Sequence, residues 1–313
     1  KLASNCKKRL ALTGTPMPHS PLDIFAQMRS LDSSIFGWSF FKFRYRYAKM
    51  GGFGGKQVIG YQNMDQLRAK MSEVTFQADR SVLDLPDAIH ETRLIDLSPK
   101  GRKVYDELDR DFCALVREGE IVASNALVKI LRLGQITSGL VTVDSDPPEL
   151  VQVDTEKQKA VADIFEDLPS DEPVVIFGRF RSDLEAVHVA AASVGRESLE
   201  LSGRRRELEA WQRGDAPILA VQIQAGGVGI DLTHCGEQNC AYVLYLSTGH
   251  NLGDYEQSLA RVHRPGQKRT VFYYHILAKD TIDERIYKAL RARKNVVESI
   301  LADIYQEQKE VCK

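Results

Sequence analysis

The stretch VVIFGRFRSDLEAVHVAAASVG, residues 174–195, decides the fold. Its first five residues form a continuous apolar run, which is typical of a strand buried on both faces of a sheet. The residues from Arg181 onward have a helical pattern that ends at Gly195, so a helix follows the strand. A strand joined directly to a helix is the repeating unit of a parallel α/β sheet.

The same unit recurs through the second half of the chain. Short apolar strands separated by helices predict an α/β lobe with a parallel sheet and helices on both faces. In such a sheet, ligands bind at the carboxyl ends of the strands, so the loops there are expected to carry the function. The further expected elements are strands SLELSG (198–203), ILAVQI (218–223), AYVLYLS (241–247) and VFYYHIL (271–277), and helices 204–214, 253–264 and a long charged one from about Thr281.

The first half of the chain has a different, mainly helical pattern. RLALTGTP (9–16) predicts a short strand that runs into a turn, and a helix begins near Ser20 because proline at position 21 suits a first helical residue. Apolar residues three or four apart predict further helices over 98–118 and about 121–137. The paired prolines of SDPPELVQVD (145–154) make that segment the best linker candidate.

Residues 38–56 alternate aromatic and basic side chains and end in a glycine-rich turn. One interpretation is an amphipathic helix that buries Phe40, Phe41 and Tyr45, and the other is a nucleic-acid face. The loop GGFGGKQ (51–57) is not a phosphate-binding loop, because Gln rather than Ser or Thr follows the lysine.

Composition excludes several classes of protein. The 313 residues are 43% hydrophobic and carry a net charge of −1, so a nucleic-acid face has to be a local basic patch. No apolar run has the length of a membrane span, and no signal peptide is visible. Five scattered cysteines indicate a reducing compartment, and His234, Cys235 and Cys240 lack the second pair that a zinc site needs, so no metal site is expected. The chain does not begin with Met and is expected to be a fragment or a processed piece.

The loop QIQAGGVGIDLT (222–233) follows a predicted strand directly. Gly226, Gly227 and Gly229 let the backbone approach a phosphate or a ribose closely, although a tight structural turn explains them equally well. The loop fails as a dinucleotide fingerprint, because the third glycine is absent and Asp231 comes too early.

The stretch YEQSLARVHRPGQ (255–267) places Gln257, Arg261 and Arg264 at i, i+4 and i+7, which share one face of a helix. Such a face is either a solvated basic surface, with arginines paired to nearby carboxylates, or an anion site. The proline-glycine stop and the planar guanidinium fork favour phosphate oxygens.

In order along the chain, these segments resemble the motifs of SWI/SNF-type ATPases, which are double-stranded-DNA translocases of helicase superfamily two. The resemblance covers almost the whole chain and corresponds to the carboxyl-terminal portion of such an ATPase. In the first half of the chain, RLALTGTP is similar to the third motif, the segments 38–47 and 98–137 are similar to the helical protrusions, and VLDLP (82–86) is similar to the approach to the second lobe. In the second half, PVVIFGRFRSDL (173–184) is similar to the fourth motif, AGGVGIDLT (225–233) to the fifth motif and QSLARVHRPGQ (257–267) to the sixth motif. TIDERIYKALRARK (281–294) is similar to the brace helix.

The resemblance implies a domain organisation and a role for the arginines. It implies the end of a first RecA-like lobe over 1–30, helical protrusions and a connector over 31–145, a second RecA-like lobe over 146–280 and a brace helix over 281–313. It also implies that Arg261 and Arg264, with Gln257 beside them, reach ATP and magnesium held mainly by the first lobe, while Gly227, Gly229 and Asp231 approach the nucleotide. No G-x-x-x-x-G-K-[ST] run occurs in the sequence, so the chain alone is expected to have no ATPase activity.

Double-stranded DNA is the expected partner, contacted through its backbone without sequence preference. The candidate contacts are Thr15, Arg179, Arg181 and Gln224, with 204–206 as a further basic cluster. Departures from the family pattern at Gln222, Gln224, Asp231 and His250 suggest a bacterial or viral branch acting in the cytosol, or in the nucleus if the source is eukaryotic. The alternative is a helicase-like module that binds DNA or protein without catalysis.

Overall fold

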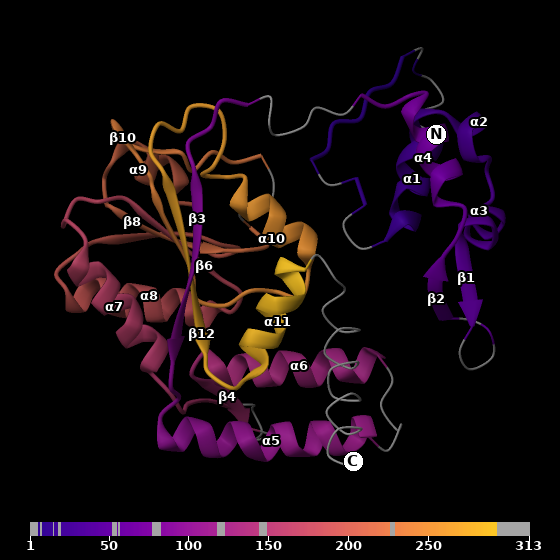
Figure 1. Cartoon of the computed structure of the whole chain (residues 1–313). Helices are drawn as coiled ribbons and strands as arrows, with labels where there is room; N and C mark the ends of the chain where they lie inside the picture. The colour runs from indigo at the N-terminus through magenta and orange to yellow at the C-terminus, as the bar shows by residue number, and fades with distance from the viewer. Residues whose placement is uncertain are drawn as a thin grey trace. The chain divides into compact units, whose positions relative to one another are not determined.

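The computed structural model describes residues 6, 8–14, 16–17, 20–51, 55, 57–76, 83–117, 123–143, 149–225 and 229–292. The chain divides into two compact units, an amino-terminal unit (Lys1–Asp84) and a carboxyl-terminal unit (Leu85–Lys313). Figure 1 identifies the elements of each. Among the described residues, no helix has both the length and the apolar character needed to cross a bilayer.

The carboxyl-terminal unit is built on a parallel sheet. Among the described residues, this sheet has six strands in the order β3-β12-β11-β6-β8-β7, and every neighbouring pair is parallel. All five residues of β6 are buried, as the unbroken apolar run predicts. The predicted α/β sheet is therefore confirmed. The strands are β3 (Ala88–Ile95), β6 (Val174–Gly178), β7 (Ser198–Leu201), β8 (Ile218–Gln222), β11 (Tyr242–Tyr245) and β12 (Val271–Ala278).

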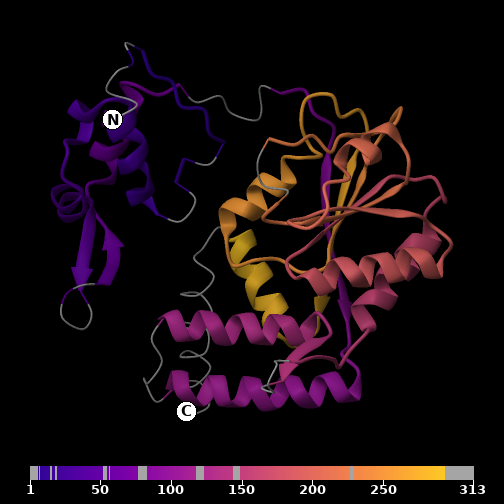
Figure 2. The ribbon, with the colours of Figure 1, turned by 180° about the vertical axis from the view of Figure 1, so that it is seen from behind.

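Helices cover both faces of this sheet. Side chains such as Val174 and Ile176 pack on one face with the helices α7 and α8, whereas Val175 and Phe177 point to the other face and join the cluster that contains Tyr255 of α10. Figures 1 and 2 show α7 and α8 on one side of the sheet and α10 and α11 on the other. The helices are α7 (Glu156–Asp167), α8 (Arg181–Ser193), α9 (Leu208–Arg213), α10 (Leu252–Leu259) and α11 (Ile282–Arg291).

The sheet contains one strand that the apolar runs do not predict. β3 lies within the segment assigned to protrusions and connector, yet it pairs with β12 along its whole length. Its side chains are exposed or half-buried, because it is the edge strand, so no continuous apolar run marks it. The domain boundaries at 30, 145 and 280 stay a prediction.

The predicted linker at 145–154 is wrong for its described part. Residues 149–152 form β5 (Glu149–Gln152), which pairs antiparallel with β4 (Leu140–Val143). The two units divide between Asp84 and Leu85 instead. Ahead of this hairpin, the two predicted helices are present as α5 (Pro99–Arg117) and α6 (Ala123–Thr137), and a short hairpin of β9 (His234–Cys235) and β10 (Gln238–Asn239) precedes β11.

The amino-terminal unit is a small group of helices with one hairpin. Its predicted first helix begins as expected, since the Ser20 hydroxyl accepts the Leu22 amide and Asp23 completes a capping box. Residues 9–14, in contrast, do not form the predicted strand, and the side chains of Leu10 and Leu12 are 83% and 88% exposed. The elements are a short 3-10 helix (Pro21–Asp23), α1 (Ile24–Leu31), α2 (Ser33–Phe36), α3 (Phe40–Tyr47), β1 (Ala48–Gly51), β2 (Gln57–Tyr61) and α4 (Met64–Ser72).

The aromatic segment forms the predicted helix, α3, but in another rotation. Phe43 and Tyr47, four residues apart, are the buried pair, whereas Phe40, Phe41 and Tyr45 are exposed. The buried rings pack against one another at 4.9 Å between centroids. Because aromatic residues occur on both faces of this helix, the sequence pattern alone does not select the buried face.

Candidate functional site

The segment that resembles the sixth motif is only partly helical. α10 starts at Leu252, capped by the Asn251 side chain, and ends at Leu259. Gln257 is therefore helical, whereas Arg261 and Arg264 lie in the turns that follow, and the prediction of one continuous helical face is wrong. Pro265 prevents the helix from continuing through this segment, because it has no amide hydrogen to donate to the Arg261 carbonyl and its ring clashes with a helical carbonyl at that position.

The carbonyl of Arg261 instead joins this turn to the loop that resembles the fifth motif. It accepts the Leu232 amide at 3.0 Å. Arg264 Nη1 donates to the Ile230 carbonyl at 3.3 Å and lies 3.8 Å from Asp231 Oδ2. The two motifs, distant in the sequence, therefore meet through both backbone and side-chain contacts.

The Arg264 guanidinium is only weakly paired within its own unit. Burial, followed by the charge of Arg264, lowers the pKa of the Arg261 guanidinium, while the charge of Asp231 acts in the opposite direction. The pair between Asp231 and Arg264 is long, and these two side chains are 48% and 38% exposed. An ion pair of that kind is weak. Arg264 is thus partly balanced within its own lobe rather than neutralised.

Asp231 is held mainly by Thr233 of its own loop. Burial alone would raise the pKa of its carboxyl, but hydrogen bonds from Thr233, and then the charge of Arg264, hold that pKa below its ordinary value. Gly229 has φ of +71°, a conformation that favours glycine, and its surroundings are open. Gly227 lies outside the described residues.

The rule that ligands bind at the carboxyl ends of the strands predicts that the arginine turn lies there. In the structure the turn lies elsewhere. α10 follows β11 and runs back across the sheet, so its end reaches the edge where the strands begin. There, His263 Nε2 lies 2.7 Å from the Pro86 carbonyl ahead of β3, and Gln267 Nε2 donates to the Cys240 carbonyl ahead of β11. The predicted placement at the carboxyl edge is therefore wrong for Arg261 and Arg264.

The residues predicted to contact DNA do follow the carboxyl ends of β6 and β8. The Arg179 amide donates to Ser247 Oγ at 2.8 Å and to buried Asp183, and the Arg179 guanidinium lies 3.1 Å from Nδ1 of His250. Arg181, at the start of α8, and Gln224 are exposed. Thr15 lies outside the described residues. The structure thus brings these side chains to one edge of the sheet and the arginine turn to the other.

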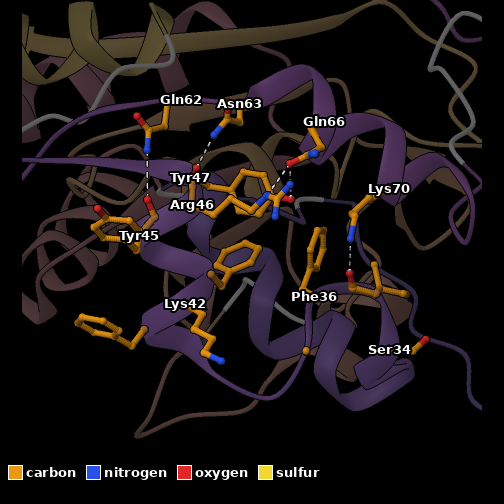
Figure 3. Close-up of a pocket in the computed structure, with 14 residues that line it drawn as sticks. Ser34, Phe36, Lys42, Tyr45, Arg46, Tyr47, Gln62, Asn63, Gln66 and Lys70 are labelled. Carbon is orange, nitrogen blue, oxygen red and sulfur yellow. Dashed lines mark hydrogen bonds between the residues drawn. The ribbon is translucent and has the colours of Figure 1, made fainter.

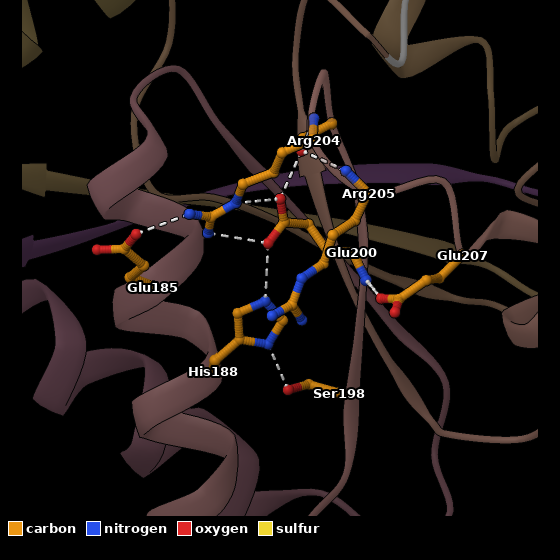
Figure 4. A network of polar contacts seen from close by, with 8 residues as sticks. Glu185, His188, Ser198, Glu200, Arg204, Arg205 and Glu207 are labelled. Carbon is orange, nitrogen blue, oxygen red and sulfur yellow. Dashed lines mark hydrogen bonds and ion pairs between the residues drawn. The ribbon is translucent and has the colours of Figure 1, made fainter.

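The basic cluster at 204–206 is not a free cationic patch. Arg204 donates two hydrogen bonds to the carboxylate of Glu200 and one to Glu185, all within 3.0 Å (Figure 4). On the other side of Glu200, His188 lies between this carboxylate and Ser198. We therefore remove Arg204 from the candidate DNA contacts, while Arg205 and Arg206 remain exposed.

The Glu200 network predicts a loss of stability in acid. Burial would raise the pKa of Glu200, but hydrogen bonds from Arg204, Ser202 and His188 lower it from 4.5 to about 2. A lowered folded-state pKa stabilises the fold above pH 4.5, and this contribution is lost as the pH falls toward 2. Urea unfolding measures the free energy of unfolding at pH 6 and at pH 3. The decrease between these two values is expected to be smaller in Glu200→Gln than in the parent chain. The same decrease in Glu200→Gln as in the parent chain would contradict the prediction. Glu185→Gln, which alters an exposed partner of Arg204, is the matched control.

Sequence reasoning missed a second buried network at the carboxyl edge of the sheet. Lys157 Nζ donates to Asp283 Oδ2 at 2.6 Å and to the Leu246 carbonyl at 2.8 Å. Thr137 Oγ1 donates to the other Asp283 oxygen, so one carboxylate joins α6, α7 and α11. Both charged side chains are at least nine-tenths buried. No spacing in the sequence links residues so far apart.

Comparison with known proteins finds relatives over nearly the whole chain. Protein p41 of Acyrthosiphon pisum secondary endosymbiont phage 1 is 26% identical over 302 residues, which cover 93% of this chain and 63% of that protein. An ATP-dependent helicase of Mycoplasma pneumoniae is 24% identical over 316 residues, which cover 94% of this chain and 28% of the helicase. The chain thus spans less than two thirds of the length of these relatives. No family model matches it.

Solved structures agree with the fold. The carboxyl-terminal part of the Fun30 ATPase domain matches with a TM-score of 0.53 at 17% identity, covering 72% of this chain and 99% of that one. The SWI2/SNF2 ATPase core of Sulfolobus solfataricus, solved with double-stranded DNA, matches with a TM-score of 0.50 at 20% identity, covering 88% and 59%. The predicted RecA-like lobe is confirmed. The chain is thus similar in sequence to ATP-dependent helicases and similar in fold to the carboxyl-terminal part of solved SWI2/SNF2-type ATPase domains.

Proposed function

We propose that the chain is the carboxyl-terminal half of an ATP-dependent double-stranded-DNA translocase. In this proposal Arg261 and Arg264 act on the phosphates of ATP held by another lobe. The observation that carries it is the joined turn and loop, in which the Leu232 amide donates to the Arg261 carbonyl and the Arg264 guanidinium contacts Ile230 and Asp231. Arginines aimed at a transferring phosphoryl group stabilise the charge that develops there.

The residues present fit the phosphate part of ATP rather than its magnesium. Guanidiniums suit phosphate oxygens, and a Cβ at Gly229, in the adjoining loop, would meet no atom within 4 Å. Asp231, the carboxylate beside them, is already engaged by Thr233 and Arg264. We therefore assign the magnesium and the main phosphate contacts to a lobe that carries a G-x-x-x-x-G-K-[ST] loop, which these 313 residues lack.

DNA is proposed to follow the carboxyl edge of the sheet, where Arg179, Arg181 and Gln224 lie. Contacts from such side chains go to the phosphate backbone, which makes binding independent of sequence and strongly dependent on salt. Thr15 is retained as a candidate from the resemblance alone. Because the arginine turn and the proposed DNA contacts lie at opposite edges of one sheet, a movement driven by ATP would be transmitted through the sheet to the DNA.

The test compares this chain alone with a protein that joins it to a phosphate-binding lobe. We expect no ATP turnover from the chain alone and DNA-stimulated turnover from the joined protein. Turnover by the chain alone would refute the proposal.

The partial balance of Arg264 by Asp231 favours one alternative, a helicase-like module that binds without catalysis. That alternative predicts a joined protein that binds ATP and DNA but hydrolyses nothing.

A further inference from the structure

A cavity of about 700 Å³ lies beside α3 in the amino-terminal unit (Figure 3). Its walls come from α2 and the glycine after it, from α3, and from α4 with the two residues ahead of it. In Figure 3, Lys42, Tyr45 and Arg46 lie on the α3 side, with Gln66 and Lys70 on the α4 side. The volume falls within the range of small-molecule sites in proteins.

The helix that borders this cavity carries more aromatic residues than packing requires. Phe43 and Tyr47 already fill its buried face, at 2% exposure each. Phe41 and Tyr45, also four residues apart, line the cavity and remain 69% and 74% exposed. One buried stripe is enough to hold a helix of this length in place, so the second pair is not explained by the core.

A basic residue follows each exposed ring, giving Phe41-Lys42 and Tyr45-Arg46 one helical turn apart. Arg46 Nε donates to the amide oxygen of Gln66 at 2.6 Å, and Lys70 Nζ donates to the Ile35 carbonyl at 3.0 Å. These acceptors are neutral. None of the fourteen described residues that line the cavity is Asp or Glu, so its positive charge is not balanced from within.

The charge of the whole amino-terminal unit reinforces that of the cavity. Residues 1–84 contain thirteen Lys and Arg against six Asp and Glu, although the complete chain has a net charge of −1. A surplus of cations in one unit attracts polyanions to it.

We propose that this cavity binds single-stranded nucleic acid, with bases stacked on Phe41 and Tyr45 and phosphates at Lys42, Arg46 and Lys70. Exposed rings and basic side chains in alternation are what single-strand binding needs, because every base has a π-face and every linkage a charge. A duplex keeps its bases stacked inside and does not offer them to the rings. The proposal is independent of the translocase function, which concerns double-stranded DNA and none of the residues that line this cavity.

The test measures binding of a fluorescent single-stranded oligothymidylate to the whole chain by anisotropy. Phe41→Ala with Tyr45→Ala is expected to weaken binding at least about tenfold, since stacking on one side chain contributes about five- to hundredfold. Phe76→Ala removes a 95% exposed ring outside the cavity and is expected to leave affinity unchanged. Wild-type affinity in the double variant would overturn the proposal.

Charge variants give a second measurement that does not depend on the rings. Lys42→Gln and Arg46→Gln are each expected to reduce the slope of log affinity against log salt by about 0.7, the value for one phosphate of a single strand. Lys49→Gln, an exposed lysine outside the cavity, is the control. Unchanged slopes in the two cavity variants would overturn the proposal even if the ring variant fails to fold.

Competition identifies the occupant. Unlabelled oligothymidylate is expected to displace the probe at lower concentration than polyglutamate of equal charge. Equal displacement by polyglutamate would reassign the cavity to acidic peptides and overturn the proposal. Loss of duplex affinity equal to the loss of single-strand affinity in the double variant would also overturn it, because the rings would then not be reading exposed bases.

Discussion

Replacing Arg264 with alanine, in a protein that joins this chain to a phosphate-binding lobe, is expected to lower DNA-stimulated ATP turnover by about 10³- to 10⁵-fold while ATP still binds. The reason is that the guanidinium would act on charge that develops only during phosphoryl transfer, so its loss falls on turnover rather than on binding. Steady-state turnover and nucleotide affinity, measured on the same preparations, separate the two effects.

Two further variants sharpen this test. Arg264→Lys is expected to recover little activity, because a point charge does not replace the bidentate fork. Arg213→Ala removes an exposed arginine that pairs with Asp215 in the same unit and is expected to keep full activity. Wild-type turnover in Arg264→Ala would eliminate the arginine from the mechanism.

Lys157→Met is expected to lower the free energy of unfolding of the chain by about 3–5 kcal/mol. The substitution keeps the apolar stem but leaves the buried carboxylate of Asp283 without the cation that lies 2.6 Å from it. A charge left alone in a buried site loses its hydration without compensation. Urea unfolding followed by circular dichroism measures the difference.

The control for this prediction lies on the same helix. Lys159 pairs with Glu156 at a similar distance, but its side chain is 63% exposed, so Lys159→Met is expected to leave stability unchanged. The double variant Lys157→Met with Asp283→Asn is expected to lose less free energy of unfolding than the two single variants together, because it leaves no buried carboxylate without a cation. Equal effects of Lys157→Met and Lys159→Met would show that the buried pair does not hold the helices together.

The strands of the sheet interior could be predicted because burial on both faces leaves a direct mark on the sequence. Residues 174–178 and 218–221 are unbroken apolar runs and lie in β6 and β8. β3 was not predicted because it is an edge strand whose side chains are exposed or half-buried, so no apolar run marks it in the sequence. The buried face of α3 was misjudged because aromatic residues occupy both sides of that helix.

The sequence predicted which residues belong to the candidate site, but not how they are arranged in space. Arg261, Arg264 and Asp231 are close together, as the two motifs imply, yet the arginines lie in a turn rather than on a helix. The effect of Pro265 on the carbonyl four residues earlier was available from the sequence. The contacts that complete the arrangement, such as the Leu232–Arg261 bond, depend on tertiary folding and leave no local pattern.

The pairing of β3 with β12 has a consequence for how the lobe is made. During synthesis β3 leaves the ribosome before the other strands of its sheet, yet the strand beside it is the last of them to emerge. The sheet therefore closes only after translation has passed Ala278, and until then β3 and β11 each present an unpaired backbone edge. Nascent chains in that interval are the ones at risk of pairing with each other, and a chaperone that shields an open edge would act there.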